Sequence, residues 1–256
     1  MAYFKHTWRV VFLLTVFSVA VKATPVVAAD LVVSAAASLT NAFKELGEDF
    51  TKQHADTPVL TSFAASDVLA QQIVNGAPVD VFASADQSAM AKAVAAGVID
   101  AATRANFVQN KVVLIVPIDN PKHIQSVADL AHPEVLRVAY GNPSTVPVGR
   151  YTQSALEQMG QWGAVESRKI LGQNVRQVLD YVSRGEVDAG FVFATDAQIM
   201  PDKVLVIEQL STTQPVNYPI ALVQRAAPNP KAQAYVDYIL SESGQATLAK
   251  YGFVSP

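Results

Sequence analysis

Four short stretches place small, uncharged residues at the predicted start of a helix, and together they could bind an anion. They are "SAAASLTNAF", "TSFAASDVLAQQI", "YGNPSTVPVGRYTQSAL" and "LGQNVRQVLDYV". A helix start leaves backbone N–H groups without partners and carries about half a positive charge. Several such starts meeting at one point would hold an anion without any cationic side chain.

Ser38 and Ser66 are the side chains in these stretches best suited to contact an anion. Each stands in an "AAS" run that follows an apolar segment, among residues too small to cover a ligand. Each is also a good N-cap, Ser38 ahead of Leu39 and Ser66 ahead of Val68, and most capping serines bind only their own helix. Spacing alone therefore leaves both interpretations open.

Motifs of enzymes are missing from the sequence. It has no GxSxG, Walker A, GxGxxG or HExxH pattern. A serine hydrolase using Ser38 or Ser66 would need a nearby base. The histidines after residue 29 lie in polar, Pro-rich or loop-like surroundings and read as surface residues: His54, His123 and His132. The acids that flank strands are expected in strand-end and cap roles, not in a metal cluster: Asp80, Asp86, Asp188 and Asp196.

Charged residues near the four junctions are predicted to face solvent. Arg150 and Arg176 follow the third and fourth helix starts and are expected to be solvated on the first helical turn. Asp67 follows Ser66 and is expected to point to solvent, where it complements the helix dipole.

The first 29 residues have the layout of a secretory signal peptide. Lys5 and Arg9 precede an uncharged apolar run from Val10 to Val21, and "VVAAD" offers small residues for cleavage near Ala29. The run is shorter than the roughly 20 residues needed to span a bilayer, which disfavours a membrane anchor. We therefore expect an exported protein, and the periplasm is the best match for a chain with no cysteine.

The remaining 227 residues, 256 less 29, suffice for two lobes of about 100 residues each. Loss of Lys5, Arg9 and Lys22 with the leader takes the formal net charge from −3 to −6. This acidic balance argues against nucleic acid, which needs clustered Lys and Arg.

Apolar runs alternate with helical periodicity from Leu31 onward, which predicts an α/β fold with parallel sheets and helices on both faces. The expected strands are Leu31–Ser34, Val59–Phe63, Val79–Phe82, Val112–Val116, Leu136–Tyr140, Ala189–Phe193, Val204–Ile207 and Ile220–Val223. The expected helices are Asn41–Phe50, Val68–Val74, Gln87–Ala96, Arg150–Met159, Val175–Ser183 and Ala232–Leu240.

Six motifs in order along the chain resemble the ModA family of periplasmic molybdate-binding proteins of ABC transporters. They are "AAASLTNAF", "FAASDVLAQQI", "GAPVDVFASADQ", "VPVGRYTQSALEQMG", "NVRQVL" and the terminal "YGF". The resemblance implies a two-lobed type II periplasmic binding protein fold with the ligand in the cleft between mostly parallel sheets. It implies one lobe from residues 30–109 plus 197–256 and a second lobe from 110–196.

The same resemblance implies the ligand and the residues that hold it. Molybdate or tungstate would be bound by the hydroxyl and N–H of Ser38 and Ser66 and by the backbone N–H of Val148 and Val175. Molybdenum would be held only as this oxyanion, with no cofactor and no enzymatic activity. The implied partner is the membrane permease of an ABC transporter, and the implied unit is a monomer. The same fold tuned to sulfate or another oxyanion is the alternative.

Phe193 departs from the family pattern. Many members of the family have a tyrosine at the end of the strand that matches "GFVF", and its hydroxyl donates to the oxyanion. Phe193 lines the expected site and cannot donate. Either the site has one hydrogen bond fewer, or another donor such as Thr195 or water takes its place.

Overall fold

The computed structural model describes residues 1–2 and 30–256. The expected signal peptide, 1–29, therefore lies outside the described residues except for its first two positions. Within the described part of the chain, no helix combines the length and the apolar character needed to cross a bilayer.

One lobe is built on a sheet whose strand order is β2-β1-β3-β10-β4. Strand β10 runs antiparallel to both of its neighbours, and β1, β2 and β3 are parallel to one another. The expectation of a mostly parallel sheet is thus confirmed. The strands are β1 (Leu31–Ala36), β2 (Val59–Ala64), β3 (Val81–Ala83), β4 (Ala105–Asn110) and β10 (Val216–Leu222).

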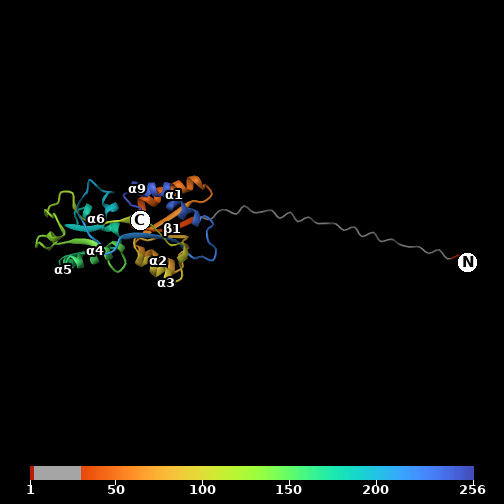
Figure 1. Ribbon diagram of the computed structural model, residues 1–256, viewed down its shortest axis with the longest axis horizontal. Coiled ribbons are helices and arrows are strands. Elements are labelled where there is room, and N and C mark those ends of the chain that lie inside the picture. The colour runs from red at the N-terminus through yellow and green to blue at the C-terminus, as the bar shows by residue number, and fades with distance from the viewer. Residues whose placement is uncertain (3–29) are drawn as a thin grey trace.

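Helices cover both faces of this sheet. Figure 1 shows α1 and α9 on one side of β1, with α2 and α3 on the other. Helix α1 packs inward through Phe43, Leu46 and Phe50, which recur at the spacing of one helical face. The elements are η1 (Ala37–Leu39), α1 (Thr40–Gln53), α2 (Ser66–Val74), α3 (Gln87–Ala95), η2 (Ala101–Thr103), α8 (Ala232–Leu240) and α9 (Glu242–Lys250).

The second lobe repeats this plan with strand order β7-β6-β8-β5-β9. Here β5 is the reversed strand, antiparallel to β8 and β9. The strands are β5 (Val112–Pro117), β6 (Val138–Gly141), β7 (Lys169–Gly172), β8 (Ala189–Phe193) and β9 (Val204–Gln209). The helices are η3 (Val127–Ala131), α4 (Pro147–Gln158), α5 (Trp162–Glu166), α6 (Val175–Ser183) and α7 (Ala194–Ala197). Figure 1 shows α6 on one side of this lobe and α4 and α5 on the other.

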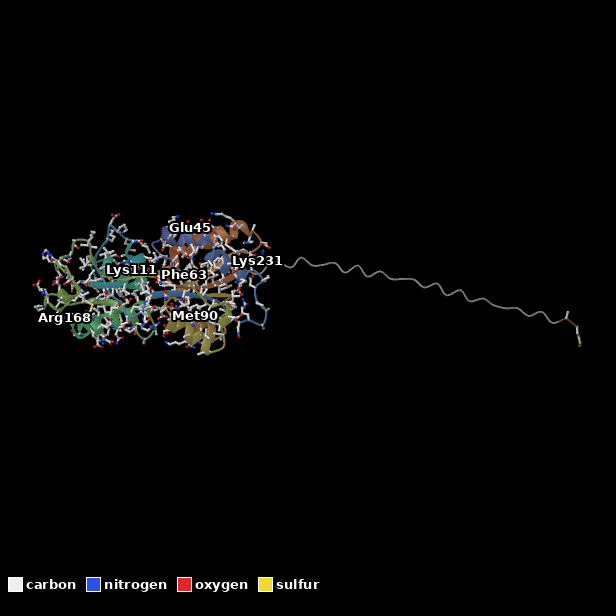
Figure 2. All side chains as sticks on the ribbon, viewed as in Figure 1. Glu45, Phe63, Met90, Lys111, Arg168 and Lys231 are labelled. Atoms are coloured by element: carbon white, nitrogen blue, oxygen red, sulfur yellow. The ribbon has the colours of Figure 1, made fainter. Side chains whose placement is uncertain are left out.

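The chain passes between the lobes at two places. The first is Lys111, between β4 and β5, and Figure 2 shows it near the meeting of the two lobes, with Arg168 at one end and Lys231 at the other. The second lies between β9 and β10. The expected assignment of all of residues 197–256 to the first lobe is wrong for β9, because residues 204–209 pair with β5 in the second sheet. An apolar strand pattern does not reveal which sheet it joins.

A tight contact fixes the start of α4 against the end of β6. A Cβ atom on Gly149 would lie 1.9 Å from the carbonyl oxygen of Gly141, so only glycine permits this approach. Pro147 begins the helix, where its missing N–H would have no helical partner in any case. The contact holds the first turn of α4 at the edge of the sheet that faces the other lobe.

Gly149→Ala is expected to lower the free energy of unfolding by about 1 to 3 kcal/mol, because the new methyl group collides with backbone that cannot rotate away. Gly163→Ala in α5 is the control, since a Cβ there meets nothing within 4 Å. Because alanine is the better helix former, that change should be neutral or stabilise by up to about 1 kcal/mol. Urea denaturation measures both. Equal stability of the two variants would contradict the close contact.

Candidate functional site

The four helix starts singled out in the sequence meet in one cleft between the lobes. The cleft has about 200 Å³ of empty space, part of it open to solvent. Helices η1 and α2 reach it from one lobe, and α4 and α6 reach it from the other. It is lined by Ala36, Ala37, Ser38, Ala64, Ala65, Ser66, Ala85, Val146, Pro147, Val148, Asn174, Val175 and Phe193.

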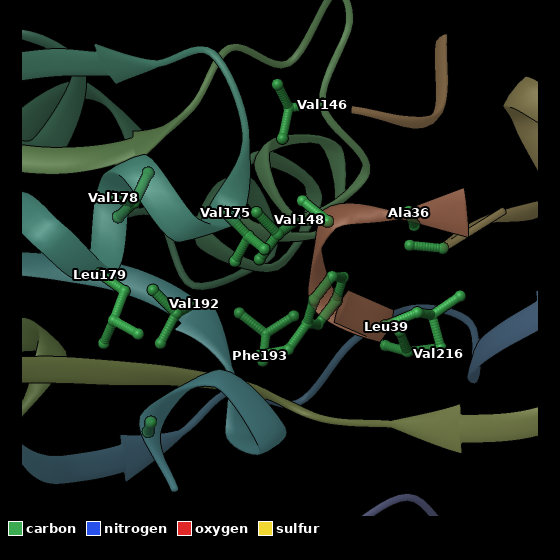
Figure 3. Close-up of a cluster of buried hydrophobic side chains, with 14 of the residues drawn as sticks. Ala36, Leu39, Val146, Val148, Val175, Val178, Leu179, Val192, Phe193 and Val216 are labelled. Carbon is green, nitrogen blue, oxygen red and sulfur yellow. The ribbon is translucent and has the colours of Figure 1, made fainter. Parts of the chain in front are cut away.

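All five residues predicted at the site line this cleft. Ser38 and Ser66 approach from the first lobe, whereas Val148, Val175 and Phe193 approach from the second. Figure 3 shows the side chains of the latter three gathered near Ala36, with Leu39 beyond. No described residue that lines the cleft carries a charge. The structure thus brings together the residues that the sequence singled out, from both lobes.

Ser66 does not cap its helix, contrary to expectation. It is the first residue of α2, the N-cap is Ala65, and no side-chain hydrogen bond caps this end. Its Oγ instead accepts a hydrogen bond from the backbone N–H of Ala85 at 2.9 Å. Because an N–H can only donate, the hydroxyl proton of this fully buried serine is left for another acceptor.

Ser38 likewise makes no capping hydrogen bond. It lies inside the 3-10 turn η1, which continues directly into α1, and the N-cap of that turn is Ala36. Its Oγ lies 3.0 Å from the hydroxyl oxygen of Tyr218, a fully buried residue of β10. The expected capping role is wrong for both serines, since the helices begin one residue or more before the positions that periodicity suggests.

The helix starts of the second lobe present backbone groups. Val148 is the second residue of α4 and Val175 is the first residue of α6. N–H groups in the first turn have no partner within their helix. Asn174 caps α6, because its side chain accepts from the N–H of Gln177 at 3.1 Å. The cap holds α6 with its amino end at the cleft.

Arg150 is not solvated as predicted but joins the two lobes. From α4 its guanidinium donates to Asp86 at 2.6 and 2.8 Å and to Asp67 at 2.5 Å, both in the first lobe. Asp67 does not point to solvent either, since only 9% of its side chain is exposed, and it also accepts from Lys92. The two carboxylates at the rim of the cleft are therefore neutralised outside it.

Arg176 forms a second bridge, which also overturns the prediction of a solvated side chain. It donates to Asn41 at 2.9 Å and to the carbonyl oxygen of Ser38 at 3.3 Å, across the interface between lobes. Its Nε donates to Asp196 at 2.5 Å. Complete burial raises the pKa of that carboxyl to about 6, although the neighbouring guanidinium opposes the rise. Neither arginine lines the cleft.

Phe193 packs against the residues behind the cleft. Its ring meets that of Tyr218 edge to face, with centroids 5.6 Å apart. Thr195, suggested as a replacement donor, is not among the lining residues; its Oγ1 accepts from the side-chain amide of Asn110 at 2.9 Å. Sequence reasoning missed Asn110 and Tyr218. No local signal marks them, because Asn110 ends the polar segment "ANFVQN" and Tyr218 stands beside Asn217 in "VNYPIAL".

Neither serine has a base beside it among the described residues. The ring of His54 packs on Phe50, and His132 lies near Asp129 in the second lobe. Asp86 caps α3 as predicted, and Asp80 and Asp188 accept backbone N–H groups near strand ends. Asp196 is instead fully buried against Arg176. No group of three or more His, Cys, Asp and Glu within the described ranges is placed to hold a metal ion.

Known proteins with similar sequences are binding proteins. The bacterial extracellular solute-binding protein family matches residues 31–254. The molybdate-binding protein ModA of Escherichia coli strain K12 is 34% identical over 233 residues, covering 87% of this chain and 88% of its own. ModA of Mycobacterium tuberculosis H37Rv is 36% identical over 230 residues, covering 90% and 86%.

Solved structures share the fold. The periplasmic molybdate-binding protein of Azotobacter vinelandii aligns with a TM-score of 0.77 at 23% identity, covering 88% of this chain and 99% of that one. The sulfate-binding protein SubI of Mycobacterium tuberculosis aligns with a TM-score of 0.76 at 18% identity, covering 88% and 86%. The expected two-lobed fold is confirmed. At these identities the structures speak to fold alone.

Arg150→Met is expected to lower the free energy of unfolding by about 1 to 3 kcal/mol, because it leaves two poorly exposed carboxylates without their shared partner. It should also increase the radius of gyration in solution scattering, since the lobes lose one bridge. Lys92→Met is the control: Lys92 pairs with Asp67 within one lobe and is exposed, so its loss should matter by less than about 0.5 kcal/mol. Identical behaviour of the two variants would show that the guanidinium does not hold the lobes together.

Proposed function

Because the chain belongs to the bacterial extracellular solute-binding protein family, we propose that it binds molybdate or tungstate in the periplasm for delivery to an ABC importer. The observation that carries the proposal is the convergence of Ser38, Ser66, Val148 and Val175 on one uncharged cleft. The molybdate-binding relatives, each more than 30% identical over most of both chains, support this choice of ligand.

Hydrogen bonds alone supply enough binding energy for a high-affinity site. The proposed donors are the hydroxyl and N–H of each serine and one N–H each from Val148 and Val175, six in all. A hydrogen bond to a charged group contributes about 1.5 to 3 kcal/mol, so six give roughly 9 to 18 kcal/mol before the costs of association. Micromolar to nanomolar binding needs about 8 to 12 kcal/mol.

The pattern of donors and acceptors favours an anion that carries no proton. Molybdate, tungstate and sulfate are fully ionised at neutral pH, whereas hydrogen phosphate needs an acceptor for its proton. Among the described lining residues there is no carboxylate, and the side-chain oxygens of Ser66 and Asn174 already accept hydrogen bonds. Size then separates molybdate from the smaller sulfate, because helix ends held by packing cannot close around a smaller ion.

Closure of the lobes follows from where the donors lie. The first lobe supplies four of the six proposed donors and the second lobe supplies two, so only the closed arrangement satisfies the ligand, and binding shifts the population toward it. The membrane permease of the transporter is the proposed partner that binds the closed form. A single chain completes the cleft, which supports action as a monomer, and the acidic net charge supports no role with nucleic acid.

Two alternatives have less support. The sulfate-binding structure shares the fold, so a site tuned to sulfate is the nearest competitor. A serine hydrolase has no support from the relatives, which are solute-binding proteins. The contacts of Ser38 and Ser66, with Tyr218 and Ala85, include no base.

A panel of anions tests the proposal by thermal shift and calorimetry. Molybdate and tungstate should bind with a Kd of 1 µM or below, that is about 8 kcal/mol or more. At about 1,000 times Kd the free energy of unfolding rises by about 4 kcal/mol. For a chain of this size, such a gain raises Tm by about 8 to 16 °C. A shift with sulfate equal to that with molybdate would refute the molybdate assignment.

A matched pair of serine variants tests whether molybdate binds in the cleft. Ser66→Ala removes a donor from the cleft and should weaken molybdate binding by about tenfold or more. Ser34→Ala removes an equally buried serine of β1 whose hydroxyl bonds to Ser62, away from the lining residues. Its affinity for molybdate should match that of the unaltered protein.

Phe193→Tyr restores the hydroxyl that many family members place here. We expect the affinity for molybdate to rise by at most about tenfold, because one hydrogen bond is added to a site that already has six donors. Calorimetry measures the gain, and urea denaturation without ligand checks that the added hydroxyl is tolerated. An increase far above tenfold would mean that nothing in the present site compensates for the missing tyrosine.

A further inference from the structure

We infer that Tyr218 is a positioning residue that turns the hydroxyl proton of Ser38 into the cleft. It does so at the end of a hydrogen-bond chain that begins at Asn110 and runs through Tyr218 to Ser38. The inference rests on the proposed function, because it concerns how one donor of the anion site is aimed. None of the residues behind Ser38 lines the cleft itself.

The chain begins with an amide whose orientation is fixed. Oδ1 of Asn110 accepts the backbone N–H of Lys111 at 2.9 Å, so the amide nitrogen must face the other way. That nitrogen donates to Oγ1 of Thr195 at 2.9 Å and to the hydroxyl oxygen of Tyr218 at 3.2 Å. An amide nitrogen has no lone pair to accept with, so the direction of both bonds is settled.

Tyr218 accepts the hydrogen bond from Asn110 and donates one to Ser38. Its hydroxyl oxygen accepts from Asn110, and its one proton needs an acceptor because the group is fully buried. The other polar atom in contact is Oγ of Ser38 at 3.0 Å. If Ser38 donated to Tyr218 instead, the tyrosine proton would be left buried and unpaired, at a cost of about 1 to 3 kcal/mol. Burial also raises the pKa of the Tyr218 phenol well above its usual value, so the proton stays in place.

The consequence falls on Ser38. Its Oγ accepts a hydrogen bond from the Tyr218 hydroxyl, so its own proton is free to donate to another acceptor. That proton can point into the cleft, which Ser38 lines. Ser66 is arranged in the same way, since its Oγ accepts a hydrogen bond from the N–H of Ala85. Both serines therefore have an obligatory donor behind them. This shared polarity suits an anion, which offers acceptors only.

The chain also joins the segment where the lobes meet to the ligand site. Asn110 ends β4, next to Lys111 at the first passage between lobes, and Thr195 lies in α7 of the second lobe. Their hydrogen bond spans the two lobes behind the cleft. The orientation of the Ser38 hydroxyl thus depends on residues that do not line the cleft.

Tyr218→Phe removes the proposed donor and keeps the packing. The ring contacts of Tyr218 with Phe107, Phe193 and Phe253 are edge-to-face contacts that phenylalanine can also make. Calorimetry with sodium molybdate should show a Kd about three- to tenfold weaker than that of the unaltered protein. Tyr235→Phe is the matched control, because Tyr235 is also fully buried but its hydroxyl has no hydrogen-bond partner. It should bind molybdate like the unaltered protein.

A double-mutant cycle separates positioning from a general structural role. In a Ser38→Ala background, Tyr218→Phe should cause no further loss beyond about twofold, because the proton that it aims is gone. A similar loss in both backgrounds, or no loss in either, would overturn the inference. Absence of molybdate binding by the unaltered protein would instead overturn the proposed function.

A second variant tests the same chain if Tyr218→Phe fails to fold. Asn110→Asp places an acceptor where the amide donor stood, so Tyr218 would donate to it and Ser38 would donate to Tyr218. The affinity for molybdate should fall by at least about threefold, because the Ser38 hydroxyl would no longer donate into the cleft. Repulsion between the added charge and molybdate would persist in the Ser38→Ala background. The loss of affinity caused by turning the Ser38 hydroxyl away from the cleft would vanish there. A loss of equal size in both backgrounds counts against the inference.

Discussion

Backbone N–H groups at the starts of helices from two lobes must meet at one point, and the rest of the structure serves that constraint. Such groups have no partner within their helix and draw in negative charge. The alanines at residues 36, 37, 64 and 65 keep the approach open. Gly149 lets α4 begin against the end of β6, and Asn174 caps α6, so both helix ends of the second lobe are fixed in place. The neutrality of the lining is therefore what the proposed binding mode requires.

Formal charge is present close by but is kept outside the cleft. Arg150 neutralises Asp67 and Asp86 at the rim, and Arg176 bridges to Asn41 and Ser38 while it holds the buried Asp196. The contacts of Arg150 with both rim carboxylates, and those of Arg176 with Asn41 and Ser38, cross from one lobe to the other and hold the two lobes together. Hydroxyl groups, in contrast, are left inside and are aimed by donors behind them, Ala85 for Ser66 and Tyr218 for Ser38.

Local pattern predicted the parts of the molecule that depend on nearby residues. The apolar runs gave most of the strands, and the junctions placed Ser38, Ser66, Val148 and Val175 at helix starts that do line one cleft. The predictions that failed depend on contacts distant in the sequence. Arg150 reaches Asp67 across 83 positions, and β9 chooses its sheet by pairing with β5. Tyr218 and Ser38 are 180 positions apart, so no window of sequence contains the pair. β7 was missed because its "KILG" segment is short and half exposed.

Anomalous diffraction from crystals grown with tungstate tests the central claim most directly, because the heavy atom marks its own position. The binding mode described here predicts one strong peak between the lobes, within hydrogen-bond reach of the hydroxyls of Ser38 and Ser66 and the N–H groups of Val148 and Val175. No arginine or lysine side chain should touch the oxyanion. A peak elsewhere, or an oxyanion held directly by Arg150 or Arg176, would contradict it.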